Sequence, residues 1–516
     1  MHVTILGGGG FRVPLIARQL AASGLPVSRV VLHDTDAGRL AVMAGVLRGD
    51  RLPASEADRA GASDRAGASD RAGAADGAGA SAGADASAGG AAGPLPVTTA
   101  AGLDEAVRGA DVIFSALRPG GLDGRVSDER SALALGVLGQ ETVGAGGLAS
   151  AARTVPVADA IARRIAALAP DAWVISMTNP AGIVTEVMTA VLGNRVIGVC
   201  DSPVGLIRRA CAACGVDPGP TLGAVTDRVD ADYLGINHLG WLRGLRAGGG
   251  ADLLPGLLDA PERLLLTEEG RLFGADVLRA LGSIPNEYLY WYYANREALR
   301  DVLAGRTRGE HVRTRQQAFY AAAAAALANG TAPAAVARLW QDANDERNRS
   351  YFAELRTGEH AGDRDEADVA AGGYESVAIA LASALCGGPA ARLILNVPNG
   401  DTVPALPPGM VIEVPCLVDA VGPVPLPVSA PSAHQLGLMS AVRASERDIA
   451  DAALIAAGTT STADPADGAD AADPADAAGR AAALALRAFA THPLVGSLDA
   501  ARSLAAAALP MASHPA

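Results

Sequence analysis

The first 200 residues alternate between short apolar segments and helix-like segments, and this alternation constrains the fold more than any other feature. Segments suited to strands occur at residues 3–10, 29–36, 111–121, 172–182 and 195–200, and the first ends in a glycine turn. Segments between them, such as 11–23 and 155–168, have the apolar spacing of helices. Apolar strands that alternate with helices indicate a parallel sheet covered on both faces. We therefore predict an α/β fold in which residues 1–205 form a Rossmann-like, doubly wound parallel sheet.

The pattern changes after about residue 215. Long Ala-rich helices are predicted at 314–330 and 334–356, and strands at 391–397 and 409–418. Residues 206–516 are therefore predicted to form a mixed α/β, helix-rich C-terminal domain that carries the catalytic, substrate and oligomerisation surfaces. A cleft between the two parts would give an architecture similar to that of lactate and malate dehydrogenases.

Two segments have too few apolar side chains to offset the entropy lost on ordering. Residues 53–93 contain the imperfect repeat DRAGASDRAGASDRAGAAD, and residues 460–479 are similarly rich in Ala, Asp and Gly. We predict both to be disordered, low-complexity insertions.

Charge and cysteine content exclude several classes of protein. The formal net charge of -14 would repel nucleic acids and anionic membranes, so a small molecule is the expected partner. No apolar run reaches the roughly 18 residues of a membrane span. The five cysteines fit no disulfide scaffold, and the CAAC at 211–214 lies in a helix-like stretch. We expect a soluble, reduced, cytoplasmic protein.

The motif ILGGGGFR is typical of a turn that binds a dinucleotide. A strand enters Gly7 and Gly9 and a helix follows, so the backbone can approach a pyrophosphate at the helix N-terminus. Gly10 and Phe11 belong to the same turn, and Arg12 stands where a third glycine is usual. Asp34 ends the second strand, where a carboxylate can bind ribose, which favours NAD over NADP. The alternative is a glycine turn with an unrelated surface aspartate.

Three later strands also end in polar residues. Arg118, Asn179 and Cys200 follow the apolar segments VIFSAL, VISMT and VIGV. Open α/β sheets bind ligands at these carboxyl ends. Taken singly, the three residues could be a surface ion pair, a turn residue and a small buried hydrophobe.

Three further segments could contribute chemistry. His238 lies in the apolar stretch DYLGINHLGWL and could be either a hydrogen-bonded core residue or a ligand. IPNEYLYWYY (284–293) is an aromatic cluster in which one tyrosine could act as a base. Residues 127–147 carry Asp128 and Glu141, and the glycine-rich GQETVGAGG suggests a loop held close to a ligand.

Seven motifs follow one another along the chain: ILGGGGFRVP, LRPGGLDGRVSDER, GVLGQETVGAGG, MTNPAGIVTE, GVCDSPVGL, GINHLGWL and IPNEYLYWYY. With these motifs the chain resembles glycoside hydrolase family 4, the NAD- and divalent-metal-dependent glycosidases, and most closely its 6-phospho-β-glucosidases. The resemblance covers nearly the whole chain outside the two low-complexity segments.

The resemblance implies a role for each candidate residue. Cys200 and His238 would be the protein ligands of a divalent metal, usually Mn²⁺, although manganese generally prefers oxygen ligands. Tyr288 would be the base. The remaining implied roles are a general acid at Glu141, or otherwise Asp128, and substrate contacts at Arg118, Arg12, Asn179 and Asp201, with Asn179 also touching the cofactor.

The implied reaction is an exception to two-carboxylate glycoside hydrolysis. It comprises oxidation at C3 of the sugar by NAD, removal of the C2 proton, loss of the aglycone, addition of water and re-reduction. The implied substrate is a phosphorylated disaccharide or aryl glycoside, and the implied assembly a homodimer or homotetramer. Alternative family substrates are 6-phospho-α-glucosides, α-galactosides and α-galacturonides.

Two hypotheses from other classes are the alternatives, and the first of them shares the cofactor fold. A malate-type 2-hydroxy-acid dehydrogenase would need a His–Asp relay and no Cys200. A catalytically inactive sugar-nucleotide sensor would not need Cys200, His238 and Tyr288 together.

Overall fold

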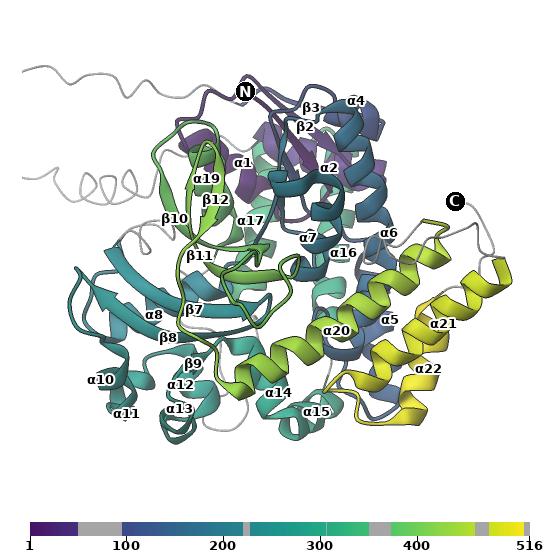
Figure 1. Cartoon of the computed structure of the whole chain (residues 1–516). Helices are drawn as coiled ribbons and strands as arrows, with labels where there is room; N and C mark the ends of the chain where they lie inside the picture. Colours follow the sequence, from purple (N-terminus) through teal and green to yellow (C-terminus); the bar gives the residue numbers. More distant parts are fainter. Residues whose placement is uncertain (50–94, 220–227, 306, 350–372, 460–473, 510–516) are drawn as a thin grey trace, which may run out of the picture.

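A single sheet of twelve strands runs through the computed structural model, which describes residues 1–49, 95–219, 228–305, 307–349, 373–459 and 474–509. The strand order is β3-β2-β1-β4-β5-β6-β10-β11-β7-β8-β9, and β12 pairs with β11. Figure 1 shows β7 and β8 side by side, with β10, β11 and β12 above them. The strands are β1 (His2–Leu6), β2 (Arg29–His33), β3 (Val97–Thr99), β4 (Val112–Ser115), β5 (Trp173–Ser176), β6 (Val196–Val199), β7 (Val229–Ile236), β8 (Leu239–Ala247), β9 (Ile284–Pro285), β10 (Ala391–Pro398), β11 (Val411–Asp419) and β12 (Gly422–Pro425).

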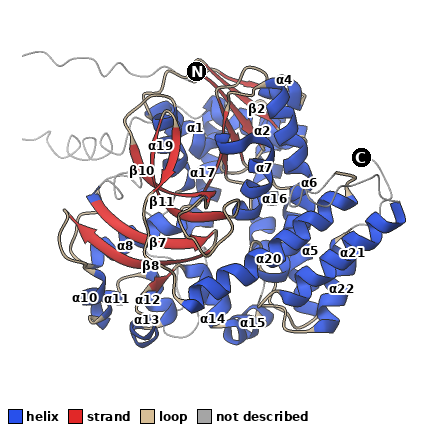
Figure 2. Ribbon diagram, viewed as in Figure 1, coloured by secondary structure: helices blue, strands red, loops and turns tan. Residues whose placement is uncertain are grey.

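Helices surround the sheet (Figure 2). The longer ones are α1 (Val13–Ala22), α2 (Ala37–Gly49), α5 (Gly121–Ala134), α6 (Gly144–Leu168), α7 (Ala181–Leu192), α8 (Ser202–Ala213), α15 (Asn295–Ala304), α16 (Arg308–Ala328), α17 (Pro333–Arg349), α19 (Tyr374–Leu385), α20 (Ala433–Ala456), α21 (Pro474–Thr491) and α22 (Leu498–Ala508). The short ones are α4 (Leu103–Val107), α10 (Leu254–Leu258), α11 (Pro261–Leu264), α12 (Glu268–Phe273), α13 (Ala275–Leu281) and α14 (Tyr290–Tyr293), with 3-10 turns at Gly193–Arg195 and Glu287–Leu289.

The first six strands are parallel and have the order 3-2-1-4-5-6, which is that of the Rossmann fold. Alternate side chains of each strand point to opposite faces, so the apolar segments bury both. Ile5 and Phe114 contribute to the core that includes α1, whereas Leu6 and Ile113 contribute to the core that includes α6 and α7. The predicted doubly wound sheet is confirmed, with strands shorter than the apolar segments that predicted them.

The second half of the chain continues the same sheet with antiparallel strands. β10 pairs with β6 and β11, and β11 pairs with β7, so Gly198, Asn396, Glu413 and Gly235 form one row across four strands. The predicted mixed α/β, helix-rich second half is confirmed. The division of the chain at residue 205 stays a prediction, because hydrogen bonds join the two halves in one sheet.

The helices α16 and α17 cover the glycine turn after β1. Phe11 packs against Phe319 and Trp340, with ring centroids 5.4 and 5.9 Å away. The Trp340 indole donates to the Phe11 carbonyl at 2.8 Å, and the Tyr320 hydroxyl donates to the Gly9 carbonyl at 2.6 Å. Residues more than 300 positions away in the sequence therefore build one wall of the turn.

Two predicted boundaries are wrong. The glycine-rich end of residues 139–147 is the first turn of α6, which begins at Gly144. Gly146 and Gly147 suit this turn because a Cβ on either would collide with the backbone of the preceding loop. The second low-complexity segment is helical from Pro474, since proline at a helix start and an Ala-rich continuation both favour a helix. Residues 460–473, the whole of 53–93 and the end of the helix predicted at 334–356 lie outside the described residues.

The described residues contain no membrane-spanning helix, and the two cysteines of CAAC are free thiols. No helix in the described ranges is long and apolar enough to cross a membrane. Cys211 and Cys214 are free thiols at the end of α8, and burial raises the pKa of Cys211 to about 12. The protonated, unreactive form is therefore favoured, as expected for packing residues.

Candidate active site

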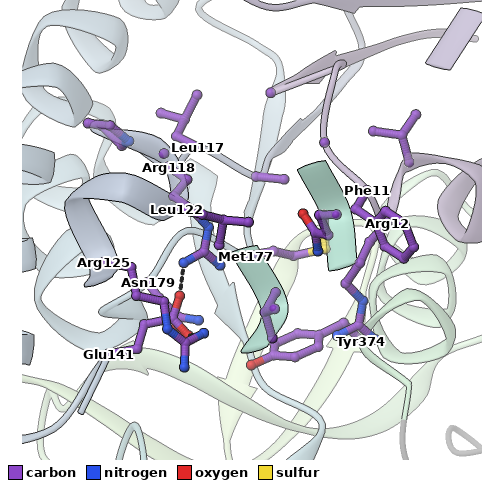
Figure 3. A pocket seen from close by; sticks show the side chains of 18 of the residues that line it. Phe11, Arg12, Leu117, Arg118, Leu122, Arg125, Glu141, Met177, Asn179 and Tyr374 are labelled. Atoms are coloured by element: carbon purple, nitrogen blue, oxygen red, sulfur yellow. Dashed lines mark hydrogen bonds and ion pairs between the residues drawn. The ribbon is translucent and has the colours of Figure 1, made fainter. Parts of the chain in front are cut away.

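One large cavity of about 1190 Å³ opens at the carboxyl ends of the parallel strands and is lined by residues from both halves of the chain. The predicted site residues that line it are Gly7, Gly9, Gly10, Phe11, Arg12, Asp34, Arg118, Asp128, Glu141, Asn179, Asp201 and Tyr288. Cys200 and His238 are buried beside lining residues, at 1% and 2% exposure. Figure 3 shows Arg118, Arg125 and Glu141 on one side of the pocket and Phe11, Arg12 and Tyr374 on the other.

The glycine turn leaves no room for side chains. Gly7 has a left-handed backbone (φ +79°), and a Cβ there would collide with the Ala116 carbonyl. The Asp34 carboxylate accepts the Gly9 N–H at 2.9 Å and the Asp36 N–H at 2.9 Å, which fixes it beside the turn. The close backbone, the helix α1 behind it and this carboxylate fit a dinucleotide.

Arginines and carboxylates alternate along one wall of the cavity. Glu141 pairs with Arg118 and, at 2.6 Å, with Arg125, while Arg153 donates to both oxygens of Asp128 at 2.7 and 2.5 Å. Burial raises the pKa of Asp128 above its ordinary value, although Arg153 opposes this. Glu141 is thus held between two guanidinium groups.

Arg118 lies among other cations. Its side chain is 44% exposed to the cavity, yet loss of solvation and the neighbouring Arg125, Arg347 and Arg39 lower its pKa to about 9. An anion bound at this wall would relieve the repulsion between these cations. The buried amide oxygen of Asn179, which has no hydrogen-bond partner, is a further group available to a ligand.

Cys200 directly follows the β6 strand, and its sulfur lies 3.9 Å from the Tyr374 hydroxyl. Burial raises the pKa of its thiol well above the ordinary value, and the carboxylates of Glu413 and Asp201 raise it further. A neighbouring cation is therefore needed to hold Cys200 as thiolate. Tyr374 in turn lies beneath Arg12, whose guanidinium carbon is 4.9 Å from its ring centroid.

His238 is held on two sides in the turn between β7 and β8. Its backbone is left-handed (φ 61°), and its ring stacks on Tyr288 with centroids 3.7 Å apart and planes inclined by 5°. Nδ1 lies 2.7 Å from the Thr142 hydroxyl, whereas Nε2 is buried without a hydrogen-bond partner. Burial lowers the pKa of His238 to about 3, so the ring is neutral. A neutral imidazole with an unpartnered nitrogen suits a metal ligand.

No group of three or more His, Cys, Asp and Glu side chains in the described ranges could hold a metal ion. A metal at Cys200 and His238 would therefore need further ligand atoms from water or the substrate. The pairing of these two residues stays a prediction.

The sequence reasoning missed several lining residues. Glu287 is buried, and the Ser202 hydroxyl donates to one of its oxygens at 2.7 Å. Burial raises the pKa of Glu287 to about 7. In the sequence, only its position directly before Tyr288 indicated that Glu287 lies at the site. Tyr374 and Arg125 had no such signal, because only folding brings them to the cavity.

The strand order and the glycine turn define the class: an α/β protein with the dinucleotide-binding Rossmann fold, whose second half completes the cavity. The family follows from comparison with known proteins. The model described as "Family 4 glycosyl hydrolase" matches residues 84–215, and "Family 4 glycosyl hydrolase C-terminal domain" matches residues 233–458. Together they match more than half of the chain, which belongs to glycoside hydrolase family 4.

The matches to relatives within the family cover most of the chain. A probable 6-phospho-β-glucosidase of Bacillus subtilis is 28% identical over 361 residues, which are 68% of this chain and 72% of the relative. The 6-phospho-β-glucosidase of Thermotoga maritima, solved with manganese, NAD⁺ and glucose 6-phosphate, matches with a TM-score of 0.68 at 21% identity over 99% of this chain and 98% of its own. A 6-phospho-α-glucosidase from gut microorganisms, solved with NAD and Mn²⁺, matches at 0.67 and 21% over 98% and 97%.

Proposed function

We propose that the chain is an NAD- and Mn²⁺-dependent glycosidase that hydrolyses 6-phospho-β-glucosides. The observation that carries this proposal is the stack of Tyr288 on His238, which sets a phenol on the cavity wall against an imidazole with an unpartnered nitrogen. The chemistry of a simple dehydrogenase requires neither this pair nor Cys200. Family membership and the relatives solved with NAD and manganese support the same assignment.

The glycine turn and Asp34 would hold NAD, and Cys200 Sγ and His238 Nε2 would hold the metal. When bound, NAD supplies reversible hydride transfer at C3 of the sugar, and the metal supplies a positive charge that acidifies the neighbouring C–H. Tyr288 would take the C2 proton as a phenolate and become a neutral phenol. Arg118 binds the 6-phosphate, and Arg12 is a second candidate.

The remaining groups orient the sugar and protonate the leaving group. Asn179 contacts both the sugar and the cofactor through its buried amide, and Asp201 accepts from a sugar hydroxyl. Glu141 is the first candidate for the acid, and Asp128 is the second. Burial raises the pKa of Asp128, and both carboxyl groups pair with arginines. We also expect a homodimer or homotetramer, which sedimentation would measure.

One assay tests the proposal. The protein is incubated with p-nitrophenyl 6-phospho-β-glucoside, NAD and Mn²⁺ under reducing conditions. Nitrophenol release that stops with EDTA or in Cys200→Ser, without accumulation of NADH, is expected. NADH formation from a 2-hydroxy acid that is insensitive to EDTA would instead identify a malate-type dehydrogenase.

The same assay decides the sugar. Because 6-phospho-α-glucosidases are among the relatives, the α-anomer is run in parallel, with the unphosphorylated β-glucoside as the control for the phosphate. Faster turnover of the α-anomer would overturn the β assignment and leave the chemistry intact.

A further inference from the structure

Thr142 connects the GQET loop to His238 through a chain of hydrogen bonds whose direction can be worked out. The Thr142 backbone N–H lies 2.8 Å from Gln140 Oε1. Because a backbone N–H can only donate, the Gln140 atom facing it must be the amide oxygen and not the nitrogen. The Thr142 hydroxyl lies 3.3 Å from the same oxygen, so it donates its single proton there.

The direction of this bond decides the tautomer of His238. Assigning this proton to Gln140, whose oxygen can only accept, makes the Thr142 oxygen the acceptor of His238 Nδ1–H across their 2.7 Å contact. Nδ1 therefore carries the proton of the neutral ring, and Nε2 carries the lone pair. Nε2 is the buried atom that has no hydrogen-bond partner.

We propose that Thr142 is a positioning residue that holds His238 in the tautomer able to bind a metal through Nε2. The inference rests on the proposed function, which places the metal at Cys200 and His238. Stacking on Tyr288 fixes the plane of the ring, but stacking does not distinguish the two nitrogens. The hydroxyl of Thr142, oriented by Gln140, supplies that distinction. Partners of a metal-bound histidine at its other nitrogen typically change metal affinity 10–100-fold.

The test compares Thr142→Val with Thr142→Ser in the purified full-length protein. Mn²⁺ affinity is measured without substrate from the electron paramagnetic resonance signal of free Mn²⁺. We expect Thr142→Val to weaken Mn²⁺ binding by about 10–100-fold, and Thr142→Ser to stay close to the wild type. Valine keeps the shape of threonine but leaves Nδ1–H without an acceptor, so the proton can move to Nε2. Nitrogen spectra of ¹⁵N-histidine-labelled protein should then show loss of the Nδ1–H form.

Thr185→Val is the matched control, because Thr185 is also buried, does not line the cavity, and its hydroxyl has no hydrogen-bond partner. Mn²⁺ affinity should be unchanged there. If Thr142→Val fails to fold, Gln140→Ala replaces it, since this change frees the Thr142 proton to be donated to Nδ1. Unchanged Mn²⁺ affinity in the folded member of this pair overturns the inference.

Two further variants separate this failure from failure of the proposed function. Cys200→Ser and His238→Ala should each abolish the Mn²⁺ binding that the wild type shows. Wild-type Mn²⁺ affinity in either variant would show that Cys200 and His238 do not form the metal site. Loss of binding in both, together with wild-type affinity in Thr142→Val, would overturn only the role of Thr142.

Discussion

Replacing Gly7 by alanine tests whether the glycine turn needs the close contact between its backbone and that of Ala116, which leaves no room for a side chain. Gly7 follows β1 with φ +79°, and an added Cβ would lie closer than 3.0 Å to the carbonyl group of Ala116, which follows β4. Both partners are backbone, and β1 and β4 are neighbours in the parallel half of the sheet. The contact can therefore be relieved only by moving one strand end away from the other.

Two costs add at this position. A left-handed backbone costs an alanine about 1–2 kcal/mol, and forcing extra volume into a packed interior costs about 1–3 kcal/mol. We expect Gly7→Ala to lower the free energy of unfolding by about 2–5 kcal/mol. Displacement of the turn should also weaken NAD binding, because the pyrophosphate must approach this backbone.

Gly24→Ala is the matched control. Gly24 has a similar φ of +71°, but nothing lies within 4 Å of the added Cβ. Only the backbone cost of about 1–2 kcal/mol is expected there, with NAD affinity unchanged. Urea denaturation gives the stabilities, and titration with NAD gives the affinities. Equal destabilisation of the two variants, with wild-type NAD affinity in Gly7→Ala, would refute the reasoning.

Three other predictions concern pH, catalysis and substrate choice. Burial lowers the pKa of His492 from 6.5 to about 4, so between these values the unfolded chain binds a proton that the folded chain does not. The free energy of unfolding should therefore fall by about 3 kcal/mol as the pH drops from 6.5 to 4, and His492→Asn should remove this contribution in urea titrations. Tyr288→Phe keeps the ring on His238 but removes the phenol oxygen, so kcat should fall by about 10²–10⁴-fold in the folded variant; normal turnover would exclude Tyr288 as the base. Arg118→Met should raise KM for the phosphorylated substrate by about 10–100-fold, the loss of one charge-assisted hydrogen bond, and leave unphosphorylated glucoside unaffected; an equal effect on both would argue against a phosphate contact.

Local patterns predicted most of the parallel half of the fold. Alternation of apolar segments and helices depends on neighbours within a few residues, so it is visible before folding. The same pattern predicted that Arg118, Asn179 and Cys200 lie close together, because the carboxyl ends of parallel strands meet at one edge of a sheet. The prediction from local patterns was wrong at the start of α6, where Gly144 to Gly147 belong to a tightly packed helix turn rather than to a loop.

Contacts between distant segments could not be predicted in this way. Tyr374 reaches Cys200 across 174 positions, and Tyr320 reaches the Gly9 carbonyl across 311. Such pairs depend on how α16, α17 and α19 pack on the completed sheet. The periodicity of a short segment does not predict how these helices pack on the sheet.

The sequence by itself determined the fold class, the residue types of the site and their order along the chain. Only the tertiary structure decided which groups touch: Glu141 pairs with Arg118 and Arg125, and Thr142 meets His238 across 96 positions. The reason is physical. Strand and helix patterns arise from the local backbone, whereas the tautomer of His238 depends on hydrogen bonds that exist only once the β7–β8 turn and the GQET loop are buried together.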